Sequence, residues 1–227
     1  SSAAAGINLK NYSSSTSGGC FDSGDINTTT ANISCSVHMW YFHPAGQWNV
    51  TVFYYEDNGS FSAQNISRNF TTLASTTAIQ ISPNNLTFSS SSAGSLNVTS
   101  TNDPIIVNNT GNVAASSGNV RVNATNLIGE ETKTDFIPAR NFSVDVFNET
   151  YGGGVGECSI GDNNSTNLTN STFAGITNSV LNVGNHTIRN GTSGQEHIYV
   201  CLNSIPQGIA AQSYSSLELG PSWVVDV

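Results

Sequence analysis

The chain has 227 residues, of which 37% are hydrophobic and 9% are charged, and its net charge is −9. This length and hydrophobic content are enough to bury a core, which excludes a disordered tail. With six Lys and Arg residues in total, the chain lacks the basic surface that binds nucleic acid or anionic lipid.

The ends of the chain show no targeting or anchoring pattern. No apolar run approaches the roughly 20 residues needed to cross a bilayer, and no charged-then-apolar segment opens the sequence. The first residues, SSAAAG, resemble the small residues around a signal-peptidase cut. We therefore expect a mature chain without a membrane span.

Strand candidates follow one another at short spacing in the first part of the chain, and no stretch keeps a helical period. The predicted strands cover residues 7–12, 33–42, 48–55 and 62–73, with turns at 43–46 and 56–59. The turn Asp57-Asn58-Gly59 favours a hairpin, because Asn and Gly tolerate the positive φ that such turns need.

A Ser- and Thr-rich stretch at residues 71–78 separates these strands from a second set. The glycine-rich stretch 152–172 is predicted to be a loop, and no helix pattern follows it to form a phosphate site. The sequence therefore predicts an all-β fold with domains at 1–77 and 78–227, and the second set of strands suits a β-sandwich. Its strands are predicted at 78–82, 85–88, 95–99, 104–109, 119–125, 142–147, 196–202 and 222–227.

Sequons, the Asn-X-Ser/Thr acceptors of N-linked sugar, occur nineteen times in the chain. Chance alone predicts roughly seven at this composition, so the excess indicates selection for N-glycosylation. The alternative is a strand surface rich in Asn and Thr that carries no sugar. The acceptors are Asn11, Asn27, Asn32, Asn49, Asn58, Asn65, Asn69, Asn85, Asn97, Asn108, Asn123, Asn141, Asn148, Asn163, Asn164, Asn167, Asn170, Asn185 and Asn190.

The middle residue of many sequons is apolar, which fits a strand with sugar on one face. Successive side chains of a strand point to opposite faces, so Asn and Ser/Thr face solvent while the residue between them faces the core. We therefore expect Asn49 to point outward from a core lined by Trp48, Val50, Val52 and Tyr54. The apolar middle residues are Ile33, Val50, Ile66, Phe70, Leu86, Val98, Phe142 and Leu168.

The chain has four cysteines, Cys20, Cys35, Cys158 and Cys201, without a CxxC motif or a neighbouring His pair. An even number in this setting favours two disulfides, and four cysteines allow three pairings. The pairing between neighbours in sequence, Cys20–Cys35 and Cys158–Cys201, places one bridge in each half of the chain. The alternative is four buried free thiols.

Motifs of catalysis are missing from the sequence. It holds no G-x-S-x-G elbow, no H-E-x-x-H and no recognisable pair of catalytic carboxylates. We therefore predict that the chain is not an enzyme and has no catalytic residues, and that it carries no cofactor beyond N-linked glycans.

Metal sites are not predicted either. His38 and His43 flank an aromatic strand end, where a place on an exposed sheet rim explains them better than a shared metal does. The Asp- and Asn-bearing turns match no complete set of calcium ligands. Those turns contain Asp22, Asp25, Asp162, Asn163 and Asn164.

Two parts of the chain resemble known extracellular repeats. Residues 35–60, CSVHMWYFHPAGQWNVTVFYYEDNGS, are similar to the Ig-like or PKD-like repeats of archaeal cell-surface proteins. Residues 102–116, NDPIIVNNTGNVAAS, and 201–216, CLNSIPQGIAAQSYSS, look like the second repeat of the same proteins. The resemblance implies two Ig-like antiparallel β-sandwich domains. More distantly, the second half is similar to the subunits of TasA-like fibres and archaeal threads, which assemble by strand donation.

The first repeat departs from that pattern at its start. The repeat normally opens with an additional apolar strand, and only AAAGINLKNYSS, residues 3–14, stands in that place. The resemblance therefore implies an open edge that a neighbour completes by adding a strand. The alternative is that this segment forms the missing strand within its own chain. The donor candidates are Ile7 and Leu9 near the start, and Trp223, Val225 and Val227 at the end.

We expect a structural subunit of an extracellular filament at an archaeal cell surface, with roles in self-assembly and adhesion. Its main partner is the chain itself, with other cells or surfaces as further contacts. The alternatives are a surface-layer or adhesin module, or a carbohydrate-binding domain of a larger protein in which Trp40 or Tyr41 stacks on sugar. Strand donation predicts an assembly that survives mild denaturation, whereas the alternatives predict a monomer.

Overall fold

The computed structural model describes residues 18–27, 30–37, 39–43, 45–55, 59–147, 165–184, 194–216 and 222–227. Within these ranges the chain is built of strands and one 3-10 turn, η1 (Ala139–Asn141), and the strands of every sheet pair antiparallel. The prediction of an all-β fold is confirmed. None of the helical residues described here forms a segment long and apolar enough to cross a membrane.

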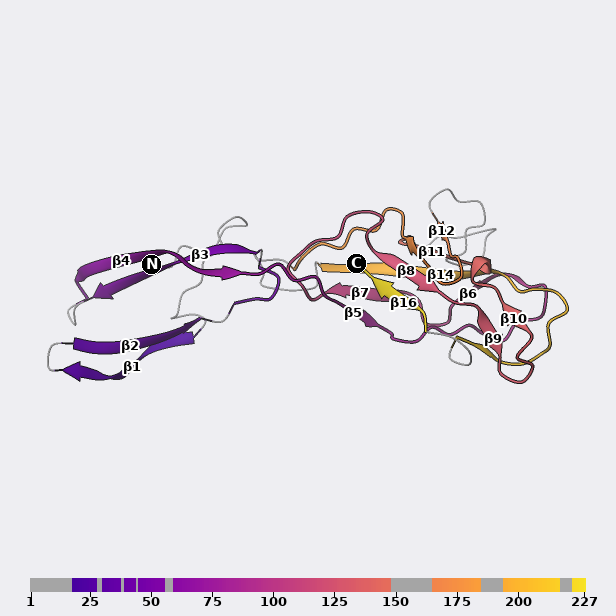
Figure 1. The fold of residues 1–227 in the computed structure, drawn as a ribbon, viewed down its shortest axis with the longest axis horizontal. Helices are drawn as coiled ribbons and strands as arrows, with labels where there is room; N and C mark the ends of the chain where they lie inside the picture. The colour runs from indigo at the N-terminus through magenta and orange to yellow at the C-terminus, as the bar shows by residue number, and fades with distance from the viewer. Residues whose placement is uncertain are drawn as a thin grey trace.

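Four strands form one group at one end of the molecule, and we call this group the N-terminal lobe (Figure 1). Strand β1 pairs with β2, and β3 pairs with β4, so the lobe consists of two separate two-stranded sheets. The β3–β4 pair confirms the predicted hairpin, whose turn residues 56–58 lie outside the described part. The strands are β1 (Gly18–Asn27), β2 (Thr30–Val37), β3 (Gly46–Tyr55) and β4 (Phe61–Leu73).

The remaining strands form the C-terminal unit, which has one six-stranded and two three-stranded sheets. The large sheet has the order β12-β11-β14-β7-β5, with β6 also paired to β14, and the smaller ones are β10-β9-β15 and β13-β8-β16. The strands are β5 (Ile79–Ser82), β6 (Leu96–Thr99), β7 (Ile105–Asn109), β8 (Arg121–Ala124), β9 (Leu127–Gly129), β10 (Phe136–Ile137), β11 (Phe142–Asp145), β12 (Thr166–Asn167), β13 (Thr172–Gly175), β14 (Gln195–Ser204), β15 (Tyr214–Ser215) and β16 (Val224–Asp226).

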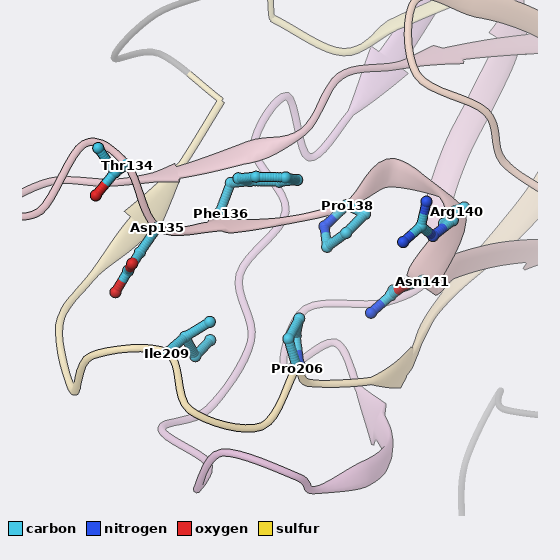
Figure 2. Close-up of a pocket in the computed structure, with 8 residues that line it drawn as sticks. All are labelled: Thr134, Asp135, Phe136, Pro138, Arg140, Asn141, Pro206 and Ile209. Carbon is cyan, nitrogen blue, oxygen red and sulfur yellow. The ribbon is translucent and has the colours of Figure 1, made fainter.

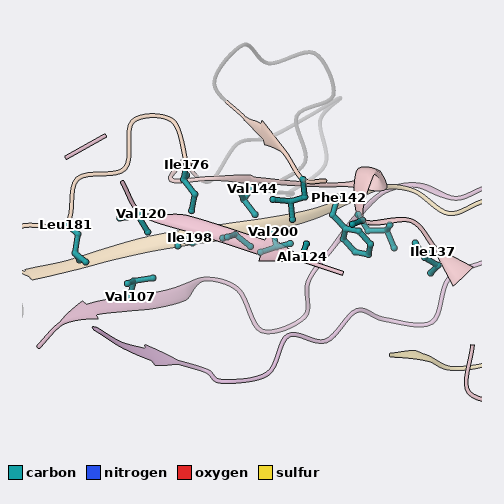
Figure 3. Packing of buried hydrophobic residues seen from close by; sticks show 14 residues of the cluster. Val107, Val120, Ala124, Ile137, Phe142, Val144, Ile176, Leu181, Ile198 and Val200 are labelled. Carbon is teal, nitrogen blue, oxygen red and sulfur yellow. The ribbon is translucent and has the colours of Figure 1, made fainter. Parts of the chain in front are cut away.

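Strand β14 organises the core of the C-terminal unit. It pairs with β11 along one edge, while β7 and β6 share its other edge, and Ile198, Val200 and Leu202 are buried. Figure 3 shows Ile198 and Val200 near Ala124 of β8 and Val144 of β11. Phe142 is fully buried, and its ring makes edge-to-face contacts with Phe88 and Trp223.

Several predicted strands end earlier than the sequence pattern indicated. Strand β2 stops at Val37, whereas the prediction continued to residue 42, and residues 41–43 form a turn. The predicted strand 85–88 is reduced to one bridge between Phe88 and Ser100. Residues 166–167 form β12 inside the predicted loop. The short strands β9, β10, β13 and β15, and the longer β1, were not predicted.

The junction between the two groups is held against the C-terminal unit. The Asn112 side chain accepts a hydrogen bond from the Thr76 N–H (2.7 Å) and donates one to the Ala74 carbonyl (2.9 Å). A Cβ at Gly111 would lie 2.2 Å from the Thr76 carbonyl oxygen, so this close approach requires glycine. The stretch 71–78, predicted as a separator, is therefore bound to the C-terminal unit from residue 74 onward.

Replacing Asn112 by alanine is expected to release residues 74–76 locally, because both side-chain hydrogen bonds are lost at a cost of about 1 kcal/mol each. Hydrogen exchange at the Thr76 amide measures this release. Asn112→Asp keeps the acceptor for the Thr76 N–H and loses only the donor to Ala74, so it should retain most of the protection. Equal protection of the Thr76 amide in wild type and Asn112→Ala would show that the Asn112 side chain does not hold residues 74–76.

Candidate functional site

The N-terminal lobe leaves its apolar side chains exposed. Phe21 and Tyr54 each expose 60% of their surface, and Val52 exposes 58%. The prediction that Trp48, Val50, Val52 and Tyr54 line a core is wrong for this chain by itself, because only Trp48 is partly buried. Monomeric proteins rarely leave such apolar area uncovered, so the lobe has the composition of an interaction surface.

The register of the β3–β4 hairpin explains why neither face forms a core alone. Val52 lies opposite Asn65, and Thr51 lies opposite Ile66. Cross-strand neighbours share a face, so each face mixes apolar and sequon-bearing positions.

The rule that the middle residue of a sequon is buried separates the two groups of strands. In the C-terminal unit Phe142 and Leu168 are fully buried, as predicted. In the lobe Ile33, Val50 and Ile66 are exposed. The apolar middle residues of these sequons are thus buried in the C-terminal unit and exposed in the lobe.

Each hairpin of the lobe also lacks a third strand. Among the described residues, β1 and β2 pair with no other strand, and neither do β3 and β4. A two-stranded sheet is marginally stable in water, and three strands or a packed face are needed for independent stability. The lobe therefore has both the open edges and the exposed apolar faces of an acceptor for strand addition.

An aromatic cluster lies between β2 and β3. Trp40 stacks on the buried Phe42 with centroids 5.6 Å apart, and Phe42 stacks on the buried His43 at 5.8 Å. Tyr41 contacts the edge of Phe42, and it is exposed, as is Trp40. The carbohydrate-binding alternative requires exposed rings, and Trp40 and Tyr41 meet only that condition.

His43 is buried, and its ring centroid lies 5.4 Å from that of Trp48. The prediction that it lies on an exposed sheet rim is therefore wrong. His38, its expected neighbour, lies outside the described residues. Asp162, Asn163 and Asn164 lie outside them too. Nowhere in the described ranges do three or more His, Cys, Asp or Glu residues gather around a possible metal position.

Where the structure describes the side chains of the predicted glycan acceptors, most are on the surface. Asn97, Asn108, Asn123 and Asn141 are partly buried, on β6, β7, β8 and η1. The exposed acceptors are Asn32, Asn49, Asn65, Asn85, Asn167 and Asn170. Outside the described side chains lie Asn11, Asn27, Asn58, Asn69, Asn148, Asn163, Asn164, Asn185 and Asn190.

Cysteine pairing follows the prediction where the structure describes it. Cys20 and Cys35 are cross-strand neighbours on β1 and β2 and form a disulfide. Cys201 is also disulfide-bonded, and Cys158 lies outside the described residues. The bridge in the lobe therefore connects two strands that pair with no third strand in the described part of the chain.

The two donor candidates have different positions. Trp223, Val225 and Val227 all pack against the core of their own chain, and the Trp223 indole N–H donates to the Thr125 carbonyl at 2.9 Å. Strand β16 pairs with β8, so the C-terminal segment is already part of its own fold. Ile7 and Leu9 lie outside the described residues.

The sequence interpretation missed a shallow pocket at the end of the molecule opposite the lobe. It has a volume of about 350 Å³ and lies between β10, η1 and the segment that follows β14 (Figure 2).

No family model, curated protein or solved structure matches this chain, so its function must be inferred from the arrangement of its own residues.

Proposed function

We propose that the chain is a structural subunit of a heavily N-glycosylated extracellular filament that polymerises head to tail by β-strand donation. The observation that carries this proposal is the N-terminal lobe, in which Val52, Phe53, Tyr54 and Phe61 are exposed on sheets of two strands. A strand from a neighbour would complete these sheets and cover their faces. Each apolar side chain buried in this way contributes about 1.5–3 kcal/mol.

The donor in this proposal is the N-terminal segment. The C-terminal candidate is bound within its own chain, since β16 pairs with β8 and Trp223 packs on Phe142. In an extended segment Ile7 and Leu9 fall on one face, as a donated strand requires. With the added strand, the lobe would become the first of two Ig-like β-sandwiches.

In this proposal, N-linked glycans cover much of the surface of the filament. Nineteen sequons replace charge as the source of hydration in a chain with 9% charged residues. Glycans on exposed acceptors such as Asn49 and Asn167 would hinder lateral sheet pairing and proteolysis, while the donated strand closes the edge along the fibre. The two cysteine bridges fit an extracellular, oxidising location.

The double variant Ile7→Asp/Leu9→Asp is expected to abolish polymerisation, because two charges would have to be buried in the acceptor. Asn8→Asp places a charge on the opposite face of the same segment and should assemble normally. Negative-stain electron microscopy and gel filtration measure assembly. Fibres of normal length from the double variant would rule out this donor.

A surface-layer or carbohydrate-binding module is the second candidate, favoured by the exposed rings of Trp40 and Tyr41. This function predicts that the wild-type chain stays a monomer and that its tryptophan fluorescence changes on adding sugar. The filament proposal predicts fibres, and assembly therefore separates the two functions.

A further inference from the structure

The β3–β4 hairpin of the N-terminal lobe has one regular strand and one bulged strand. Trp48 lies opposite Thr71, and Val50 lies opposite Ser67. Between these two pairs β4 advances four residues while β3 advances two, and a second shift nearer the turn adds one more residue to β4. The extra residues form bulges on β4, which accordingly has 13 residues against 10 in β3.

The β1–β2 hairpin shows the same asymmetry, with 10 residues in β1 and 8 in β2. Between Asp22 and Asn27 the register shifts twice, and each shift adds one residue to β1. Gly24, inside the first shift, has φ +118°, which is outside the extended conformation of a strand. Bulges bend and twist a strand, and they are one of the devices that keep an exposed edge from pairing. The edges of β1 and β4 are therefore protected.

The C-terminal unit offers no long edge among the described residues. Very short edge strands are another device against pairing with a further strand. The strands at the edges of its sheets have two to four residues each, and they are β5, β6, β10, β12, β13, β15 and β16. Among the described strands, the long edges without a bulge are thus those of β2 and β3.

Of these two edges, β3 is the better acceptor. Residues 50–55 of β3, VTVFYY, are all β-branched or aromatic, and such residues form the most favourable cross-strand pairs. The regular part of β2, residues 33–37, contains two serines, which add little to such pairs. A strand beside β3 would meet Val52 and Tyr54 on one face and Phe53 and Tyr55 on the other, and each of these side chains is more than half exposed.

We infer that the strand donated by the next copy pairs with the free edge of β3 along residues 50–55. The inference rests on the proposed function and names the edge at which it operates. The donor segment predicted at residues 7–12 has the same length of six residues, so one ladder can extend along the whole stretch. The completed sheet has the order donor-β3-β4, with the bulged strand at its outer edge. Its three strands meet the requirement for independent stability that the hairpin alone does not meet.

Amide exchange in wild-type fibres, read at single residues by mass spectrometry, tests this assignment. A strand that pairs on both edges protects consecutive amides, whereas an edge strand protects every second amide. We expect consecutive protection along residues 50–55 of β3, and alternating protection in β1, β2 and β4. The protected amides should exchange at least about tenfold more slowly than the outward amides of β4.

Disulfide trapping tests the same edge independently. Leu9→Cys in the donor is combined with Val52→Cys on β3 or, as the matched control, with Asn65→Cys, the neighbour of Val52 on β4. Adjacent strands are about 4.8 Å apart, so the β4 cysteine would be two spacings from the donor, beyond the reach of a disulfide. Moving the cysteine through residues 50–55 of β3, and through their partners in 61–67 of β4, covers every register. We expect covalent ladders on a non-reducing gel from the β3 series and none from the β4 series.

Each other outcome contradicts the edge assignment. Consecutive protection in β1, β2 or β4 in place of β3, or ladders from the β4 series, would overturn the inference and leave the filament proposal intact. Fibres in which no strand of the lobe protects consecutive amides, or in which neither series forms ladders, would overturn the pairing with β3. A wild type without fibres would overturn the filament proposal and the inference that rests on it.

Discussion

Replacing Phe142 by alanine is expected to lower the free energy of unfolding of the C-terminal unit by about 3–5 kcal/mol. Phe142 is 0% exposed, and its ring meets those of Phe88 and Trp223 with centroids 5.7 Å and 5.0 Å away. Alanine would leave a cavity at the point where the C-terminal segment packs on β11. Urea unfolding followed by tryptophan fluorescence measures the loss.

Phe147→Ala is the matched control for Phe142→Ala. It removes the same ring five residues further along the chain, where half of the side chain is exposed. Its cost should stay below about 1 kcal/mol, as for most surface substitutions. If the two variants lost equal stability, the core would not be centred on Phe142.

Replacing both Cys20 and Cys35 by serine is expected to destabilise the N-terminal lobe by about 3 kcal/mol, the chain-entropy value for a loop of this length. The bridge closes a separation of 15 residues and joins two strands that pair with no third strand among the described residues. Amide exchange in β1 and β2 should therefore rise steeply, and fibres should become scarce.

The C-terminal unit is the internal control in the same exchange experiment. Its core strands β7, β11 and β14 do not depend on this bridge, so their protection should be unchanged. Uniform loss of protection along the chain would show that the lobe and the C-terminal unit fold as one cooperative body. Unchanged protection in β1 and β2 would show that the bridge does not hold them.

Much of the C-terminal unit could be predicted from residue alternation. Residues 104–109 and 196–202 closely match β7 and β14, because each has apolar residues dense enough to show a buried strand. The sequon rule also placed Phe142 and Leu168 inside correctly. These local patterns were sufficient to predict the strands because their apolar side chains pack against neighbouring strands of the same chain.

Other elements depend on contacts that local patterns do not show. Strand β1 has the sequence GGCFDSGDIN, whose glycines and aspartates disfavour a strand. Its pairing with β2 includes the disulfide partners Cys20 and Cys35. Strands β10 and β15 have two residues each and exist because β9 lies between them. The fixation of residue 76 needs Asn112, which is 36 positions away.

The candidate site was only partly visible in the sequence. The apolar alternation of Val50, Val52 and Tyr54 was recognised, but its burial requires a partner that the described residues do not supply. The pocket could not be recognised from one stretch, because its lining residues come from two segments that are far apart in the sequence, 134–141 and 206–209.

Electron microscopy of the native material, with the same sample run on a gel after mild and after full denaturation, tests the central claim most directly. Strand donation predicts thin fibres that fall to a single chain only on harsh treatment, with added density along the open edges of the N-terminal lobe. A uniform population of monomers, or fibres with a glycan inside the contact between subunits, would contradict it.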